Sequence, residues 1–386
     1  MSILIVVLLI HLPLSYAYNF YLDLDQYGVF LINNVGIYSA MGSFVFVSGF
    51  GLYLNPENRN LNSSKKIITF LKKRFIRIFP LYWIAIILFL FFVGYLTFNP
   101  IYLVYHFFGL QIIVAPYFGD PMLTLWFIGI IVIYYLIYMV LNLLRSIKWI
   151  VTVSIAIFFF FVGLNGIFGL VEIRFFVYYF MFIGGIFTAH AYSSPLYARI
   201  KERLKKIRPG VLLLIPLGTA IISGIAFIFI TQLCYSSLVS EYGTFILDLI
   251  LELNPNFFQL ASIIFRFNLI SINFIVCAVS ILNFVFRSFR IISSKRKVES
   301  AVSVIAYSTY NVYLFHRVFL AIFIAIMTVG LNLDMRQLPN LYLVLLFVPF
   351  IFLFSYLIQK AYDRILKSSS KIFKNKELPI EVSFNE

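Results

Sequence analysis

The sequence predicts an all-α, polytopic integral membrane protein with about ten transmembrane helices. Of its 386 residues, 62% are hydrophobic and only 12% are charged, and the mean hydropathy is +0.98. Soluble domains carry about 25% charged residues and cannot bury so much apolar surface, so a cytosolic enzyme, a nucleic-acid-binding module and a disordered chain are excluded. The net charge of +15 is better explained by cytoplasmic loops beside a lipid bilayer than by binding of nucleic acid.

A transmembrane helix needs about 20 mainly apolar residues, and charged segments separate the stretches of that length. In chain order these predicted spans are residues 2–18, 29–54, 78–98, 121–144, 149–165, 168–192, 210–232, 257–286, 300–330 and 340–362. The first stretch also resembles a signal peptide, because Ser15, Tyr16 and Ala17 form a small-residue pattern like a cleavage site. A retained span is favoured, since no basic residue precedes the stretch and a histidine lies at its centre.

Positive charge falls in alternate loops, as expected when Lys and Arg remain in the cytoplasm. Of the 30 Lys and Arg residues, 26 lie in the clusters 59–77, 145–148, 199–208, 287–297 and 360–376. This alternation places both termini in the cytoplasm and predicts one membrane domain over residues 1–366, followed by a polar cytoplasmic tail over 367–386. The apolar stretch 101–117 would reverse the alternation if it crossed, so we expect it to be re-entrant or interfacial, with His106 as a buried packing residue.

Titratable side chains inside predicted spans are costly in lipid, which makes each a functional candidate. His11 lies among Val, Leu and Ile near the middle of the first span. An imidazole titrates near neutral pH and can act as a general base toward a hydroxyl; a structural hydrogen bond to another helix is the alternative. For Glu172, Arg174 and Arg266, ion pairing within the helix bundle is the simplest interpretation.

Arg74 and Arg77 form an R-x-x-R pair that leads into the span 78–98. Positions three apart share a helix face, and two guanidinium groups there are suited to hold a diphosphate through paired hydrogen bonds. The alternative is that both residues anchor the helix at the cytoplasmic surface, with Tyr82 and Trp83 in the interfacial aromatic belt.

The span 300–330 carries Tyr307, Tyr310, Tyr313 and His316 at every third position. Polar-tipped rings on one helix face favour the lining of a wet cavity, although helix packing with satisfied hydroxyls is the alternative. No metal site is expected, because Cys234 and Cys277 are isolated and no Cys/His cluster occurs. Asp and Glu are almost absent from the spans, which argues against a proton-coupled transporter.

Several short motifs occur in order along residues 3–330. They are VVLLIH ending at His11, FVSGF at 46–50, RFIRIFPLYW at 74–83, LWF at 125–127, an FxxG segment within 182–189, and YSTYNVYLFH at 307–316. Together they resemble the membrane-bound acyltransferase 3 family, whose members include O-acyltransferases of cell-envelope polysaccharides. A basic segment that family members usually carry upstream of the histidine is missing from residues 1–10, which leaves open an upstream start, altered donor binding or an inactive copy.

The resemblance implies a multi-pass enzyme of the cell membrane, and we expect this to be the prokaryotic plasma membrane. Acyl-CoA, expected to be acetyl-CoA, would bind from the cytoplasm and its acyl group would move to a hydroxyl of an envelope glycan or a lipid-linked sugar. His11 would be the catalytic base. The implied donor-binding residues are Arg74, Arg77, Ser48 and Gly49, and the implied lining of the tunnel or acceptor site is Trp126, Tyr307, Tyr310, Tyr313 and His316.

Two functional alternatives remain open from the residues themselves. One is a non-enzymatic carrier or export component for a polysaccharide, in which His11 is structural. The other is an acyltransferase for a protein or a small molecule. Within the enzyme hypothesis the sequence favours direct transfer, because no Ser or Cys nucleophile stands beside an evident base and acid.

Overall fold

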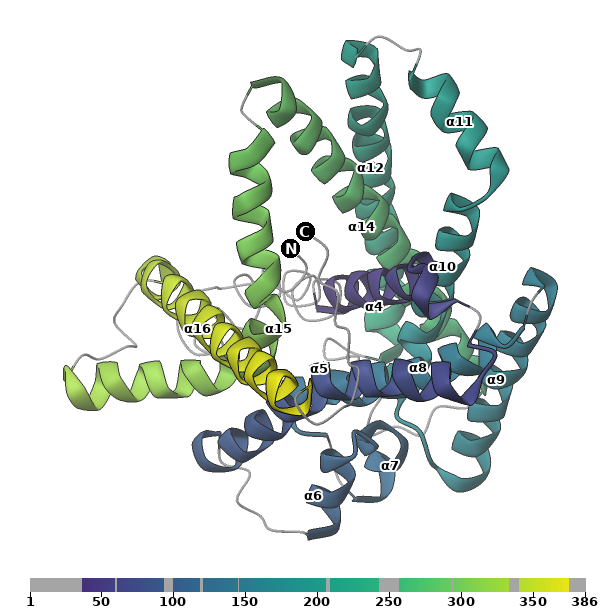
Figure 1. The fold of residues 1–386 in the computed structure, drawn as a ribbon. Coiled ribbons are helices and arrows are strands. Elements are labelled where there is room, and N and C mark those ends of the chain that lie inside the picture. Colours follow the sequence, from purple (N-terminus) through teal and green to yellow (C-terminus); the bar gives the residue numbers. More distant parts are fainter. Residues whose placement is uncertain are drawn as a thin grey trace. The chain divides into compact units, whose positions relative to one another are not determined.

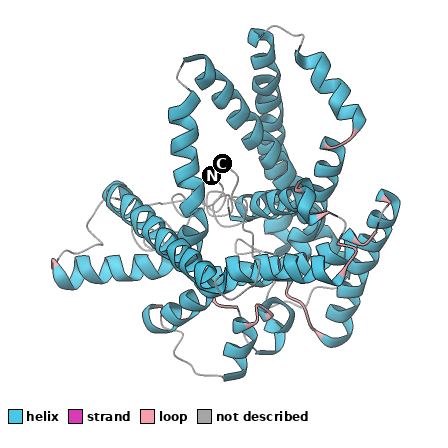
Figure 2. Ribbon diagram, in the orientation of Figure 1, coloured by secondary structure: helices cyan, strands magenta, loops and turns pink. Residues whose placement is uncertain are grey.

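The computed structural model describes residues 37–59, 61–93, 100–118, 121–144, 146–205, 209–242, 257–292, 295–332 and 340–374. Within these ranges every regular element is a helix, and turns and irregular segments connect them (Figure 2). The predicted all-helical class is therefore confirmed for the described part. The chain divides into two compact units, residues 1–295 and 296–386. His11 and the whole predicted span 2–18 lie outside the described residues.

The first unit contains most of the helices (Figure 1). They are α4 (Ile37–Leu54), η3 (Pro56–Asn58), α5 (Ser64–Phe92), α6 (Pro100–Phe107), α7 (Gln111–Phe118), η4 (Leu123–Leu125), α8 (Trp126–Asn142), α9 (Ile147–Phe168), α10 (Ile173–Tyr192), α11 (Pro195–Lys205), α12 (Pro209–Tyr242) and α14 (Phe257–Ile292). The second unit consists of α15 (Lys295–Ala325), which begins at the boundary, the π-helical turn η5 (Ile326–Gly330) and α16 (Asn340–Lys374).

Six helices in the described part are long and apolar enough to cross a membrane. They comprise Ser64–Phe92, Ile147–Phe168, Ile173–Tyr192, Leu213–Cys234, Ala261–Val285 and Tyr307–Gly330, and the apolar helices Met41–Leu54 and Trp126–Asn142 are shorter. These positions agree with predicted spans. The total of about ten spans and the cytoplasmic placement of both termini stay predictions.

Side-chain contacts establish the direction in which neighbouring helices run. Residues early in α4 contact residues early in α8, and late residues contact late ones. The ring of Phe44 contacts that of Phe127, and the Tyr138 hydroxyl donates to the carbonyl of Leu52. These two helices are therefore parallel. Helix α5 contacts α8 in the opposite order. Phe70 contacts Tyr138, whereas Arg74, which comes later in α5, contacts Tyr135, which comes earlier in α8. Consequently α5 and α8 are antiparallel.

The segment between α5 and α8 forms two short helices, α6 and α7, joined by a turn at Gly109. Each has 8 residues, so each is about 12 Å long, too short to cross a hydrocarbon core of about 30 Å. Residues 101–117 thus do not form one spanning helix. That outcome agrees with the antiparallel order of α5 and α8, which requires the chain to return on the side where α5 ended.

The predicted packing role of His106 is confirmed. Its side chain is 1% exposed, its Nδ1 lies 2.9 Å from the carbonyl oxygen of Tyr102, and its Nε2 accepts a hydrogen bond of 3.0 Å from the backbone N–H of Met122. The Trp83 indole donates to the carbonyl of Phe107 at 2.9 Å and stacks on its ring. These bonds attach α6 to α5 and to the chain that enters α8.

Glycine permits the close approach of α4 and α10. A Cβ at Gly49 would collide with the carbonyl oxygen of Phe182, and a Cβ at Gly185 would collide with the carbonyl oxygen of Phe46. Small residues bring membrane helices into backbone contact, where dispersion replaces the absent hydrophobic driving force. Helix α14 joins this pair, and its Asn268 donates to the carbonyl of Val177 at 3.0 Å.

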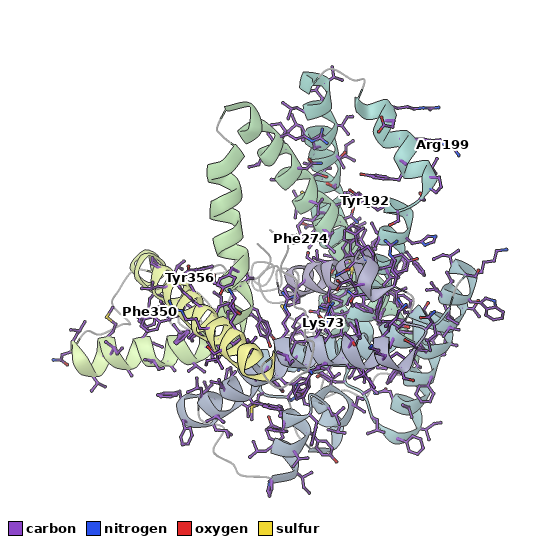
Figure 3. The ribbon with its side chains drawn as sticks, viewed as in Figure 1. Lys73, Tyr192, Arg199, Phe274, Phe350 and Tyr356 are labelled. Atoms are coloured by element: carbon purple, nitrogen blue, oxygen red, sulfur yellow. The ribbon has the colours of Figure 1, made fainter. Side chains whose placement is uncertain are left out.

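The second unit is an antiparallel pair of helices. Near the start of the pair, the Tyr307 hydroxyl donates to the carboxylate of Asp363, and near its other end the rings of Phe323 and Phe347 lie 5.5 Å apart. Phe350 and Tyr356 of α16 belong to the aromatic surface between the two helices (Figure 3). Helix α16 continues to Lys374, so the first residues of the predicted polar tail 367–386 extend the last span as helix.

Candidate functional site

Arg74 has an unusual environment for a cation on a membrane helix. Its guanidinium carbon lies 5.4 Å from the ring centroids of both Phe70 and Tyr135. The side chain is half-buried and its Nε is fully buried, with no hydrogen-bond partner among the described residues. Two aromatic faces stabilise the charge through the ring quadrupole without neutralising it. The terminal nitrogens therefore keep their capacity to bind an anion.

Ser48 contacts the same tyrosine as this cation. Its Oγ is 3.5 Å from the Tyr135 hydroxyl, so Ser48 of α4 and Arg74 of α5 contact the same residue of α8. The structure thus brings together two of the predicted donor-binding residues. Tyr135 itself was missed by the sequence interpretation, because one tyrosine in an apolar span does not distinguish itself from an ordinary packing residue.

A hydrogen-bonded platform lies beside the Ser48, Tyr135 and Arg74 group. The Tyr138 hydroxyl is 3.1 Å from the carbonyl oxygen of Leu52 and 3.0 Å from that of Asn58. Asn142 donates to the same Asn58 carbonyl at 2.8 Å and accepts from the N–H of Leu61 at 2.8 Å. These bonds bind the loop between α4 and α5 to α8, which holds the three helices in register. In the sequence, the only indication of this polar face of α8 was the spacing of three and four residues between positions 135, 138 and 142.

Arg77 and the neighbouring lysines form an exposed basic surface on α5. Arg77 is exposed, whereas Arg74 three residues earlier is half-buried. Lys73 (Figure 3) pairs with Glu57 at 2.9 Å, and this lysine lowers the pKa of the Glu57 carboxyl from its ordinary value. The two arginines therefore differ in setting: Arg74 packs against two aromatic rings, whereas Arg77 is exposed.

Gly49 packs against helix α10. Its Cα faces the backbone of Phe182, where a side chain would not fit. Of the two roles that its size allows, the geometry matches close helix approach. Its effect on Ser48 is indirect, through the position of α4.

Trp126 belongs to a separate cluster. It is 9% exposed, stacks on Tyr178 at 5.8 Å, and has the Arg174 guanidinium 4.9 Å above its ring. Arg174 also forms an ion pair with the buried Glu172, which confirms the predicted pairing within the bundle. Tyr135 follows Trp126 by nine residues on α8, a separation of about 14 Å along the axis. Trp126 thus lies away from Arg74.

The aromatic stripe of α15 does not form one uniformly exposed face. Tyr307 is 38% exposed, whereas Tyr313 and His316 are 3% and 1% exposed. The His316 Nδ1 lies 2.8 Å from the carbonyl oxygen of Tyr313, so this nitrogen carries the proton and donates. Tyr310 is intermediate in burial. The stripe therefore runs from the surface into the helix packing.

Three polar residues accompany this stripe: Asn311, which the sequence places beside it, and Gln359 and Asp363 of α16, which the sequence interpretation missed. Asn311 donates to the Gln359 side chain at 3.0 Å, and Gln359 donates to Asp363 at 3.0 Å. Asp363 also receives the Tyr307 hydroxyl. The result is a continuous chain of hydrogen bonds between α15 and α16. A period-four pattern of 355, 359 and 363 on the last span was the signal that could have revealed it.

An apolar cavity of about 860 Å³ lies between α4, α9, α10 and α14. Phe46, Phe180, Met181 and Ile272 are among its lining residues, and it contains none of the predicted site residues. Such a wall suits a hydrocarbon chain and offers nothing to a phosphate.

Comparison with known proteins assigns the chain to a family. A family model described as an acyltransferase domain matches residues 1–360. Searches of curated proteins and of solved structures find no significant match. The matched range covers most of the chain, including the segments that carry His11, Ser48, Arg74 and His316. Together with the apolar helices it indicates a membrane acyltransferase. The chain therefore belongs to the acyltransferase 3 family.

Proposed function

We propose that this protein transfers an acyl group, most simply acetyl, from acyl-CoA to a hydroxyl of an envelope glycan or a lipid-linked sugar. The observation that carries the proposal is the Arg74 guanidinium packed against the rings of Phe70 and Tyr135, with Ser48 on the same tyrosine and Arg77 three residues later. Family membership supports acyl transfer, and this cationic group supports a phosphate-bearing donor.

The electrostatics favour the diphosphate of the CoA moiety as the group bound there. A guanidinium donates two parallel hydrogen bonds to phosphate oxygens. The contacts with two rings restrain the Arg74 side chain before binding, so less side-chain entropy is lost on binding. Arg77, on the next turn and exposed, adds a second charge. Charge attraction is also stronger at a half-buried position than in water.

In the proposed reaction the acceptor oxygen attacks the thioester carbonyl carbon. His11 takes the hydroxyl proton, the new C–O ester bond forms, and the C–S bond breaks to release the CoA thiolate, which then takes up a proton. The role of His11 rests on the family resemblance. Ser48 is a weak candidate for a covalent nucleophile, because its partner in the described part of the chain is a tyrosine hydroxyl rather than an imidazole or a carboxylate.

The proposed setting is the plasma membrane of a prokaryote, with donor binding on the cytoplasmic side. The basic cluster 59–77 supports this side, because positively charged loops remain in the cytoplasm. Arg74 and Arg77 belong to that cluster. The donor would then reach its site from the compartment that contains acyl-CoA.

Inverted membrane vesicles supplied with labelled acetyl-CoA and a crude envelope-glycan fraction test the proposal. We expect label to enter the glycan with wild-type protein and to disappear in a normally inserted His11→Ala variant. The Arg74→Gln/Arg77→Gln variant should raise KM for the donor by about tenfold or more, since each charge-assisted hydrogen bond contributes about 1.5–3 kcal/mol. The matched control, Lys65→Gln/Lys72→Gln, removes two exposed cations of the same helix and should leave KM nearly unchanged.

Each other outcome has a definite meaning. Incorporation that survives His11→Ala would remove the catalytic role of this histidine while keeping the enzyme. Equal KM values in the arginine variant and its control would remove the phosphate role. No incorporation in any vesicle, from acetyl-CoA or longer acyl-CoAs, would favour a carrier or export component.

A further inference from the structure

Helix α11 follows the apolar helix α10 after a tight turn and differs from it in composition. Ser194 begins the helix, because its Oγ accepts from the N–H of Tyr197 at 3.2 Å, and Pro195 occupies the first helical position. The rings of Tyr192 and Tyr197 lie 4.4 Å apart and connect the end of α10 to the first turn of α11. The start of α11 is therefore fixed at the level where a membrane-spanning helix ends.

One side of α11 exposes apolar side chains. Leu196 is 65% exposed and Ile200 is 44% exposed. Their spacing of four residues places them on one helix face, and the sequence continues the pattern with Leu204. Exposed aliphatic residues in an otherwise polar helix of 11 residues need a partner that removes them from water.

The same helix is strongly basic. Its sequence contains Arg199, Lys201, Arg203 and Lys205 against a single acidic residue, Glu202. Arg199 and Arg203 are exposed, and Arg199 projects away from the helix (Figure 3). By helical register these two arginines occupy one border of the face that carries Leu196 and Ile200. Their charged ends can extend beside an apolar surface while the aliphatic stems cover it.

We propose that α11 is a lipid-binding helix that lies on the membrane surface and binds anionic phospholipid headgroups. Arg199 and Arg203 pair with the lipid phosphates, and Leu196 and Ile200 enter the boundary between headgroups and acyl chains. The charge of the helix is complementary to an anionic leaflet, and α11 begins where the membrane-spanning helix α10 ends. This binding is independent of the proposed acyl transfer.

A membrane surface fits these features better than a protein partner. A short helix with a narrow aliphatic stripe and flanking arginines matches the pattern of interfacial helices, in which apolar insertion and charge attraction act together. The covalent continuity with α10 also keeps α11 at high effective concentration near the leaflet. A modest intrinsic affinity is therefore sufficient to hold the helix on the lipid.

Hydrogen–deuterium exchange of the full chain in nanodiscs tests the proposal. One nanodisc contains phosphatidylcholine alone and the other contains a one-third fraction of phosphatidylglycerol. We expect backbone amides of residues 195–205 to exchange several-fold more slowly in the anionic nanodisc. High salt should reduce this protection, because exposed charges are screened. The Arg199→Gln/Arg203→Gln variant should remove most of this several-fold difference between the two nanodiscs.

A charge-matched control separates local binding from a general effect of net charge. Lys148→Gln/Arg364→Gln removes two exposed cations from α9 and α16 and should keep the protection of residues 195–205. Leu196→Ser/Ile200→Ser should weaken it, because apolar insertion is lost. Equal exchange in the two nanodiscs, or protection that is insensitive to Arg199→Gln/Arg203→Gln, would overturn the proposal. Protection already complete in phosphatidylcholine would point to a protein contact and would overturn it as well.

Discussion

Ser48 and Arg74 contact the same tyrosine, Tyr135, from two helices that run in opposite directions. The serine hydroxyl lies 3.5 Å from the tyrosine hydroxyl, and the guanidinium carbon lies 5.4 Å from the centre of its ring. One residue of α8 therefore positions both a small polar group of α4 and a cation of α5. If the donor binds here, the tyrosine ring and its hydroxyl have separable effects.

Substitution of Tyr135 should distinguish its ring from its hydroxyl. Tyr135→Phe keeps the ring beside Arg74 and should change KM for acyl-CoA by less than about threefold, whereas Tyr135→Ala removes a cation–π contact and should raise KM by about tenfold. Steady-state transfer kinetics in vesicles with equal amounts of inserted protein provide the measurement. Identical KM values for the two variants would show that the ring does not position Arg74.

Close packing of α4 on α10 should make Gly49 sensitive to the smallest substitution. Gly49→Ala or Gly185→Ala places a methyl group against a backbone carbonyl, and we expect a loss of about 1–3 kcal/mol in stability. Gly51→Ala is the matched control, since nothing lies within 4 Å of its added Cβ. Thermal unfolding in detergent should give a lower midpoint for the first two variants only. A normal midpoint for Gly49→Ala would mean that the two helices can separate without cost.

The Asn142 side chain should determine the order of the loop between α4 and α5. Asn142→Ala removes the bonds to the Asn58 carbonyl and the Leu61 N–H; the carbonyl keeps the Tyr138 hydroxyl, but loss of the partner of the Leu61 N–H costs about 1–3 kcal/mol. We expect faster amide exchange in residues 55–63 and a higher KM for the donor, because Arg74 follows that loop. Asn62→Ala, at an exposed position of the same loop, should do neither. If the amides of residues 55–63 still exchange slowly in Asn142→Ala, the Asn142 side chain does not hold this loop in place.

Asn311 should stabilise the pairing of α15 with α16. It is fully buried and lies 3.2 Å from the carbonyl oxygen of Ser355 and 3.0 Å from the Gln359 side chain. Asn311→Ala should cost about 1–3 kcal/mol, because buried polar partners lose their donor. Amide exchange along both helices is the measurement, with the exposed Arg364→Gln as control. Unchanged exchange in Asn311→Ala would indicate that the aromatic contacts suffice.

Much of the fold followed from local patterns. Apolar length and the alternation of Lys and Arg predicted the positions of the helices that the structure describes and a non-crossing segment at 101–117. The buried Glu172 and Arg174 pair was also predictable, because an ion in an apolar environment requires a partner. These inferences depend on composition over short windows, which is why they needed no knowledge of the tertiary contacts.

The partners within the site were not predictable in the same way. Several spans, among them α4 and α8, are apolar nearly all round, so periodicity does not reveal which face meets which neighbour. For this reason the spacing of polar residues was too weak a signal to identify Tyr135, Tyr138 and Asn142 as part of the site. Likewise, the stripe from Tyr307 to His316 looked uniform in sequence, although tertiary packing buries Tyr313 and His316 and leaves Tyr307 exposed.

By itself the sequence determined a helical membrane protein, the order of its apolar helices and the family to which it belongs, because hydrophobic length, charge and short motifs are properties of neighbouring residues. Only the tertiary structure decided that Ser48 and Arg74 meet at Tyr135, that Gly49 contacts α10, and that Trp126 belongs to a different cluster with Arg174. The physical reason is that helix direction and rotation are set by packing between segments far apart in the chain, where each side chain depends on a neighbour that the local sequence does not specify.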